Sequence, residues 1–276
     1  MLKKIVLTGA AGRLGTILRP ALAAMCDTLV SMDIVESVEG VAANETYVKA
    51  DVADYAAVAA LMDGVEMVCH FGAIVDEGPF EELLGPNFIG SYNVWESAFK
   101  AGARRIIYAS SIHAVGMHPR QSRIGIDAEH RPDSFYGLAK CFTEDLGRMY
   151  WDKRGLESVH LRILSCAPAK NSRALGTWLS DGDMVQLVQR SIDTPTTGFA
   201  VIYGVSDNDR SPVDNSKAAF LGYRPKDNAE QFAADILASE GAGDPTDVSQ
   251  MVHGGPFGTV PLGQSGAAAA AKGNDD

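Results

Sequence analysis

Residues 3–15 read KKIVLTGAAGRLG, an apolar β-rich run that ends in a glycine-rich turn and leads into the helical pattern TILRPALAAM. The turn spaces Gly9, Gly12 and Gly15 as G-x-x-G-x-x-G. A strand, a glycine turn and a helix in this order predict a dinucleotide site, because backbone N–H groups at a helix N-terminus bind a pyrophosphate. We expect Gly9 to permit the tight turn, Gly12 the approach of the pyrophosphate, and Gly15 close packing of the helix on the sheet.

Apolar β-rich runs alternate with stretches of helical period along the rest of the chain. The runs lie at residues 28–33, 66–71, 104–110, 158–163 and 199–203. This rhythm predicts an α/β fold with a doubly wound parallel sheet of the Rossmann type, and the continuous apolar character of the strands indicates helices on both faces. Ligands of such sheets bind at the carboxyl ends of the strands, so functional residues are sought there.

Length and composition favour one domain. The chain has 276 residues, of which 46% are hydrophobic, enough to bury one large core. We expect residues 1–262 to form a single NAD-binding domain with a small C-terminal substrate-binding part. Residues 263–276 are rich in glycine and alanine and are expected to form a disordered tail.

Charge and cysteine usage narrow the class of partner. A net charge of −11 disfavours nucleic acid and anionic membranes, and we expect neither as a partner. No apolar run is long enough to span a bilayer, and the N-terminus enters a strand directly, so a cytoplasmic location is expected. The four cysteines are widely spaced without a C-x-x-C pair, which indicates neither a disulfide framework nor a metal site.

The second apolar run ends at Asp33, a position that selects the cofactor. A carboxylate there accepts hydrogen bonds from the ribose hydroxyls and repels a 2′-phosphate, which predicts NAD rather than NADP. Arg13 and Leu14 complete the glycine turn. Arg13 could reach a phosphate, although its simplest role is a solvated residue at the start of the helix.

Further cofactor contacts are expected at two later strand ends. Asp51 and Val52 follow a short apolar segment and could meet the adenine, although Asp51 could equally cap the following helix. The run at 66–71 ends in small residues that let the backbone approach a nucleotide, and His70 within it is expected to be a core histidine. The residues concerned are Phe71, Gly72 and Ala73.

The catalytic candidates are Tyr136, Lys140 and Ser111. Tyr136 and Lys140 form Y-x-x-x-K, which places both on one helix face, and Ser111 closes the strand RRIIYASS. A phenol is a poor base at neutral pH, but an adjacent ammonium and a cationic nicotinamide can lower its pKa. Tyr136 can then take a hydroxyl proton as hydride departs to the nicotinamide, while Ser111 holds the substrate oxygen.

These motifs resemble the extended short-chain dehydrogenase/reductase superfamily, through TGAAGRLG, HFGA, YASS and YGLAK. Over almost the whole chain the sequence is similar to bacterial uronate dehydrogenases, through SSIHAVG, RILSCAP, NSRALGTWLS, FLGYRPKDNAE and HGGPF. The resemblance implies NAD-dependent oxidation of C1 of glucuronate or galacturonate to an aldarolactone. We also expect a homo-oligomer.

The resemblance also assigns roles beyond the catalytic three. His113 and Ser165 match substrate-pocket positions, and Arg173 matches an arginine expected to grip the sugar carboxylate. Cys166 matches a position beside the nicotinamide, with a packing rather than a nucleophilic role. Two further substrate positions depart from the family: Val75 stands where a serine is usual and Ile112 where an asparagine is usual. Both changes remove hydrogen-bonding groups, which favours a less hydroxylated substrate or weaker activity on uronates.

Three other functions remain open on the sequence. One is an NAD-dependent dehydrogenase of another sugar or hydroxy compound. A second is a nucleotide-sugar epimerase or dehydratase, which shares the core but needs a larger C-terminal substrate part. The third is a dinucleotide-sensing regulator, which the presence of the Tyr/Lys pair disfavours.

Overall fold

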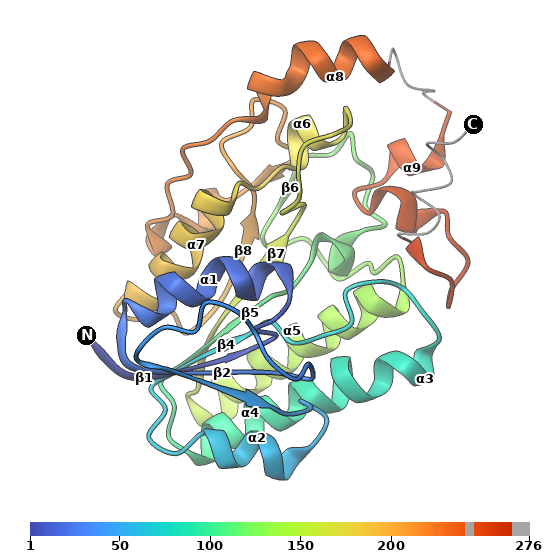
Figure 1. Cartoon of the computed structure of the whole chain (residues 1–276). Coiled ribbons are helices and arrows are strands. Elements are labelled where there is room, and N and C mark those ends of the chain that lie inside the picture. Colours follow the sequence, from blue (N-terminus) through green and yellow to red (C-terminus); the bar gives the residue numbers. More distant parts are fainter. Residues whose placement is uncertain (241–245, 267–276) are drawn as a thin grey trace.

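The computed structural model describes residues 1–240 and 246–266. Seven strands form one parallel sheet in the order β3-β2-β1-β4-β5-β7-β8 (Figure 1). The strands are β1 (Leu2–Thr8), β2 (Cys26–Asp33), β3 (Glu45–Lys49), β4 (Met67–His70), β5 (Arg105–Tyr108), β7 (Glu157–Ile163) and β8 (Phe199–Gly204). The predicted parallel Rossmann sheet is therefore confirmed. The strand order reverses beside β1, so the crevice between the ends of β1 and β4 is the topological switch point where such sheets bind ligands.

Helices cover both faces of the sheet, as the apolar strands indicated. The larger ones are α1 (Arg13–Ala23), α2 (Tyr55–Leu61), α4 (Gly90–Lys100), α5 (Phe135–Arg154) and α7 (Asp181–Asp193). Alternate residues of β1 belong to different cores: Ile5 clusters with Leu18 of α1, whereas Val6 clusters with Trp95 of α4. In Figure 1, α1 and α7 accordingly lie on one side of the sheet and α2 and α4 on the other.

Shorter elements build the region beyond the strand ends. They are α3 (Phe80–Leu83), β6 (Ile124–Gly125), α6 (Ala174–Thr177), β9 (Val213–Asp214), α8 (Ala233–Glu240) and α9 (Val248–Met251), together with a π-helical turn (Leu84–Ile89) and 3₁₀ turns (Ile112–Val115, Ser216–Leu221, Ala229–Phe232 and Gly255–Gly258). Figure 1 shows α6, α8 and α9 gathered on the side of the sheet away from α2 and α4. Within the described ranges, no helix is long and apolar enough to cross a bilayer.

The expected tail begins in a segment that the structure describes. The backbone N–H of Gly263 donates to Glu77 Oε1 at 2.8 Å, and that of Gly266 donates to Asp76 Oδ1 at 3.0 Å. Both ends of this four-residue segment, Gly263 and Gly266, are thus hydrogen-bonded to the loop after β4. Residues 267–276, the rest of the expected tail, lie outside the described part of the chain.

Candidate active site

The glycine turn after β1 has the strained, close-packed geometry that glycines allow. Gly9 has φ of +74°, and a Cβ there would lie 2.5 Å from the carbonyl carbon of Phe71. A Cβ on Gly15 would lie 2.2 Å from the carbonyl oxygen of Gly9, so α1 packs against the turn only because no side chain intervenes. Gly12 is the N-cap of α1 and meets no comparable obstruction. Within the described chain no side chain caps α1, which leaves its first N–H groups for an anion.

Asp33 stands at the end of β2 beside this turn. Its Oδ2 accepts from the Ala11 N–H at 2.9 Å and its Oδ1 from the Ile34 N–H at 2.7 Å. The carboxylate is therefore oriented by two backbone donors and holds the glycine turn as well as facing the ligand cavity. This placement supports the predicted discrimination against a 2′-phosphate.

Arg13 is not the freely solvated residue that the simplest interpretation expected. Its Nε donates to the Cys166 carbonyl at 2.7 Å, and its Nη2 pairs with Asp181 Oδ1 at 2.7 Å. The half-exposed side chain thus ties the start of α1 to the segment between β7 and α7. Cys166 takes part through its backbone, and burial raises the pKa of its thiol to about 12, in line with the expected packing role.

The structure places the other expected cofactor residues around the same cavity and decides between the two roles considered for Asp51. Asp51 does not cap the helix, because the N-cap of α2 is Asp54, which accepts from the Ala57 N–H at 3.1 Å. Asp51 accepts instead from Ala53 at 2.8 Å and lines the ligand cavity. His70 is a buried core residue bonded to Thr8 Oγ1 at 2.7 Å, and burial lowers its pKa to about 3.

A single cavity of about 820 Å³ joins the glycine turn to the catalytic candidates. Among the predicted residues, it is lined by Gly9, Gly12, Arg13, Leu14, Gly15, Asp33, Asp51, Val52, Phe71, Gly72, Ala73, Val75, Ser111, His113, Tyr136, Lys140 and Cys166. An elongated dinucleotide fits this arrangement, since an uncapped helix N-terminus lies at one end and the Tyr/Lys pair at the other. When bound, NAD supplies the hydride acceptor and a positive charge on the nicotinamide ring.

The catalytic three come from the segment after β5, which carries Ser111, and from the first two turns of α5, which carry Tyr136 and Lys140. Ser134 caps α5 by accepting from the Gly137 N–H at 2.9 Å, which places Tyr136 in the first turn. One turn later Lys140 donates to the Ala109 carbonyl at 2.7 Å, and its Nζ lies 5.1 Å from the centre of the Tyr136 ring. Ser111 lies just beyond the end of β5, after Ala109 and Ser110. The structure therefore brings the three side chains together as predicted.

The pKa of Tyr136 departs from expectation. Burial raises it to about 12, and a hydrogen bond with Ser111 offsets only part of that rise. Tyr136 is 7% exposed and Lys140 only 2%, and burial lowers the pKa of Lys140 to about 7. Desolvation outweighs the attraction between the two groups, so lysine proximity alone does not produce a phenolate. Proton removal from Tyr136 requires the further positive charge that the sequence reasoning assigned to the nicotinamide.

Three expected substrate residues lie outside the cavity lining. Ile112 is buried in an apolar cluster with Val115 and Tyr203, so its side chain belongs to the core. Ser165 bonds through its carbonyl to the Leu179 N–H at 2.8 Å. Arg173 bonds through its guanidinium to the carbonyls of His253 and Val252, and burial lowers its pKa to about 10.

Three residues of the site had no predicted role: Phe257, Asp133 and Glu77. Phe257 stacks on His113 with ring centres 4.1 Å apart, and Asp133 Oδ2 lies 2.8 Å from Nδ1 of the same histidine. Glu77 is 5% exposed and accepts from the backbone N–H of Tyr136 at 2.9 Å. The segment HGGPF contains Phe257 and was a signal of family resemblance, but no sequence pattern connects Glu77 or Asp133 to the residues they hold.

This combination of sheet, glycine turn and Ser/Tyr/Lys site defines a class. The chain belongs to the NAD dependent epimerase/dehydratase family, whose model matches residues 5–173. The expectation of an NAD-dependent dehydrogenase of the extended short-chain type is confirmed.

More specific similarities follow within that class. The chain is 44% identical to the uronate dehydrogenase of Pseudomonas putida, over 92% of this chain and 95% of the relative. A uronate dehydrogenase from Agrobacterium tumefaciens, solved with NAD, is 42% identical with a TM-score of 0.90 and covers 95% of this chain and 98% of its own. A glucuronic acid dehydrogenase from Chromohalobacter salexigens is 39% identical with a TM-score of 0.91, over the same shares of the two chains.

Proposed function

We propose that this protein oxidises the C1 hydroxyl of a uronate, such as glucuronate or galacturonate, to the aldarolactone with NAD. The observation that carries the proposal is the continuous cavity with the glycine turn at one end and Ser111, Tyr136 and Lys140 at the other. The similarity to uronate dehydrogenases over more than nine-tenths of the chain supports the substrate class.

The chemistry assigns one role to each catalytic side chain. Ser111 holds the C1 oxygen by a hydrogen bond and orients the hydroxyl towards Tyr136. Tyr136 accepts the hydroxyl proton at its phenolic oxygen. Lys140, anchored by the Ala109 carbonyl, stabilises the phenolate and thereby lowers the cost of forming the base that accepts this proton.

Arg173 is proposed to hold the sugar carboxylate, although it lies outside the cavity lining. Its guanidinium bonds to backbone carbonyls, and no ion pair cancels its charge within the described ranges. A pKa of about 10 still leaves it cationic at neutral pH. A buried cation of this kind can bind a carboxylate through charge-assisted hydrogen bonds. For a substrate carboxylate to reach Arg173, the segment 252–257 must move, because carbonyls of this segment accept the hydrogen bonds of the guanidinium.

The deciding experiment is a panel of uronates, neutral aldoses and hydroxy acids with NAD, followed by the absorbance of NADH. Uronates should give the highest kcat/KM, and a wild-type preference for a neutral sugar would refute the uronate assignment. Arg173→Gln keeps amide donors for the two carbonyls but removes the charge. It should lower kcat/KM for uronates by at least about tenfold, which corresponds to about 1.4 kcal/mol, and should change neutral aldoses little.

A matched variant guards against a general effect on the local fold. Arg120 donates to Gln250 Oε1 at 2.9 Å near Arg173, so Arg120→Gln also removes one cation from the same region. The uronate-specific loss should be larger for Arg173→Gln than for Arg120→Gln. Equal losses on both substrate classes would remove Arg173 from carboxylate recognition.

A second candidate function is favoured by Val75. This side chain is 71% exposed and lies on the wall of the cavity, where it offers no hydrogen bond to a sugar hydroxyl. Oxidation of a less hydroxylated sugar or hydroxy acid is the alternative, and the same panel distinguishes the two. Stoichiometric release of NADH also separates both from an epimerase, which returns the hydride to its substrate.

A homo-oligomer is also part of the proposal. Apolar side chains on the outer faces of α4 and α5 are exposed, and the two helices pack against each other. They are Ile89 just before α4, Tyr92 and Phe99 along α4, and Leu138, Phe142 and Met149 along α5. A second copy of the chain could bury this face. Light scattering of the wild type and of Phe142→Glu tests it, and a wild-type monomer at micromolar concentration would contradict it.

Domain organisation and location complete the proposal. We propose one domain, because the sheet runs from β1 to β8 and the segment at 263–266 bonds back to the loop after β4. We propose a cytoplasmic location, where the NAD that this chemistry consumes is available. Fractionation of the source cells tests the location, and limited proteolysis tests the single domain.

A further inference from the structure

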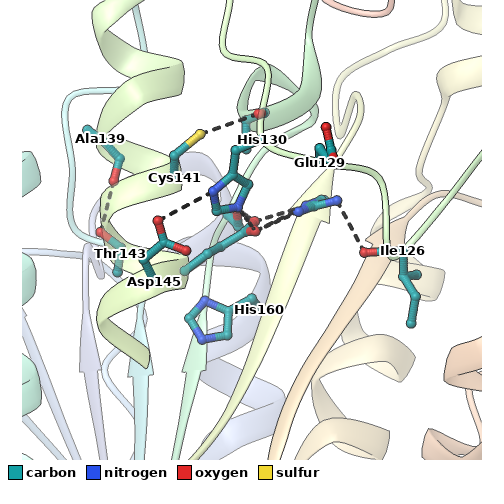
Figure 2. Close-up of polar contacts among 12 residues, drawn as sticks. Ile126, Glu129, His130, Ala139, Cys141, Thr143, Asp145 and His160 are labelled. Carbon is teal, nitrogen blue, oxygen red and sulfur yellow. Dashed lines mark hydrogen bonds and ion pairs between the residues drawn. The ribbon is translucent and has the colours of Figure 1, made fainter. Parts of the chain in front are cut away.

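Glu144 lies at the centre of a buried polar cluster behind the catalytic residues. It follows Lys140 by one helical turn on α5 and Tyr136 by two, so the three side chains share one face of the helix. The Glu144 side chain is buried. Figure 2 shows the histidines and polar groups that surround this part of α5. Glu144 is not one of the residues that we assign to the cofactor or to the substrate.

The carboxylate of Glu144 binds three different elements. Ser110 donates its hydroxyl to Oε1, and Arg162 of β7 donates from Nη2 to Oε2 at 2.7 Å. His130, in the loop before α5, places Nε2 at 2.9 Å from Oε2. Ser110 immediately precedes Ser111, so one carboxylate joins the strand end that carries the catalytic serine to the helix that carries Tyr136 and Lys140.

The electrostatics of the cluster explain why the carboxylate stays charged. Burial alone would raise the pKa of Glu144, but the hydrogen bond with His130 and the charge of Arg162 hold it well below its usual range. The Arg162 guanidinium is likewise kept protonated by Glu144. A fixed negative charge therefore persists inside the protein throughout the neutral range.

Among the titratable groups of the described chain around Lys140, Glu144 is the one that carries a negative charge to balance the ammonium. The titratable groups that face Lys140 are His70 of β4, Tyr108 of β5, and Tyr136 and Glu144 of α5. The groups that face Glu144 are Tyr108, His130, Lys140, Cys141, His160, Arg162 and Tyr203. His70 is neutral because burial lowers its pKa to about 3. Of the groups facing Lys140, Glu144 alone opposes the effect of burial on its ammonium.

We propose that Glu144 is a positioning residue for the dehydrogenase reaction: it holds the Ser111 strand end against α5 and supplies a buried negative charge that favours the ammonium form of Lys140. The inference rests on the dehydrogenase function proposed above. Loss of the charge should let Lys140 release its proton at lower pH. Because the reaction needs a protonated Lys140, the alkaline limb of the pH profile should move to lower pH.

The test compares Glu144→Gln with Asp145→Asn, which removes the neighbouring, exposed carboxylate. Glu144→Gln should lower kcat at least about tenfold, and this fold-change should exceed the fold-change in KM. The alkaline limb of the kcat profile should move to lower pH by about one pH unit or more. Asp145→Asn should leave both near wild type. Glu144→Asp retains the charge and should restore the wild-type alkaline limb, although its shorter reach lowers kcat.

A second variant covers a folding failure of Glu144→Gln. That substitution leaves the Arg162 guanidinium buried without its partner, which is strongly destabilising. Glu144→Gln/Arg162→Met removes both charges together and should fold while showing a shift of the alkaline limb in the same direction, reduced because a neighbouring cation is also lost. Folded variants with a wild-type pH profile would overturn the proposal and leave Glu144 a purely structural residue.

A measurement without substrate separates this inference from the proposed function. The titration of Lys140 can be followed by NMR of protein with 13C-labelled lysine, its signal assigned with Lys140→Met. The midpoint should be lower in the charge-neutral double variant than in wild type. An unchanged midpoint refutes the electrostatic role even if no panel substrate is turned over, whereas a shifted midpoint in an enzyme without uronate activity refutes only the substrate assignment.

Discussion

The backbone N–H of Tyr136 donates a hydrogen bond of 2.9 Å to Oε2 of Glu77, so a carboxylate from the loop after β4 caps the first turn of the catalytic helix. The other oxygen of the same carboxylate accepts from the Gly263 N–H at 2.8 Å. Negative charge at a helix N-terminus is stabilising. One buried side chain thus links the catalytic tyrosine to the C-terminal part of the described chain.

Replacing the Glu77 carboxylate should weaken its hydrogen bonds with the backbone N–H groups of Tyr136 and Gly263. Glu77→Gln leaves one acceptor and places an amide donor against a second N–H, with an expected loss of about 1.5 to 3 kcal/mol in the free energy of unfolding. The value of kcat should fall several-fold because Tyr136 is less well placed. Thermal unfolding and steady-state kinetics measure the two effects. Glu81→Gln, an exposed position on α3, is the control, and equal behaviour of the two variants would contradict the role given to Glu77.

Tyr136→Phe should abolish turnover while leaving NAD binding nearly intact. Only the phenolic oxygen is lost, and the ring still packs against His113. A general base contributes at least about 100-fold, so kcat should fall by that factor or more. Calorimetry of NAD binding and an activity assay measure the two outcomes, with Tyr92→Phe on the exposed face of α4 as control. Near-wild-type activity would remove Tyr136 from proton transfer.

Asp33→Asn should weaken the preference for NAD over NADP. The amide oxygen still accepts from the Ala11 N–H, so the glycine turn is retained, while the charge that repels a 2′-phosphate is lost. The ratio of kcat/KM for the two cofactors should fall at least about tenfold. Asp27→Asn, at the exposed start of β2, should leave the ratio unchanged. A wild-type preference for NADP would refute the role of Asp33 outright.

His130 should make stability depend on pH. Its hydrogen bond with Glu144 raises its pKa above the ordinary value near 6.5, so the charged imidazole stabilises the folded state. This contribution is fully present below the unfolded-state pKa and is lost as pH rises through the folded-state pKa. The melting temperature of the wild type should therefore decline from about pH 6.5 upwards relative to that of His130→Asn. Parallel curves for the two proteins would show that this imidazole carries no linked charge.

Local patterns were enough to predict the frame of the protein. Each predicted strand is present, and the short apolar segment before Asp51, at residues 47–50, overlaps β3. Gly15 could be assigned because its role depends on neighbouring backbone within the same β-turn-α unit. Gly9 could be assigned because the tight turn itself requires a positive φ, although the close approach of Gly9 to Phe71 after β4 is a tertiary contact. Tyr136 and Lys140 could be paired because an i, i+4 spacing fixes two side chains on one face of a helix.

Tertiary contacts decided the rest. Glu77 meets Tyr136, Glu144 meets Arg162, and Arg13 meets Asp181 across large separations in sequence, and no periodicity encodes such pairs. The raised pKa of Tyr136 was also beyond the sequence, because it depends on how completely the folded chain removes water from the phenol. Sequence by itself determined the elements and the chemistry that they carry, since both follow from local spacing. Only the tertiary structure decided which charges face one another and how strongly they are desolvated, because burial is a property of the whole packed chain.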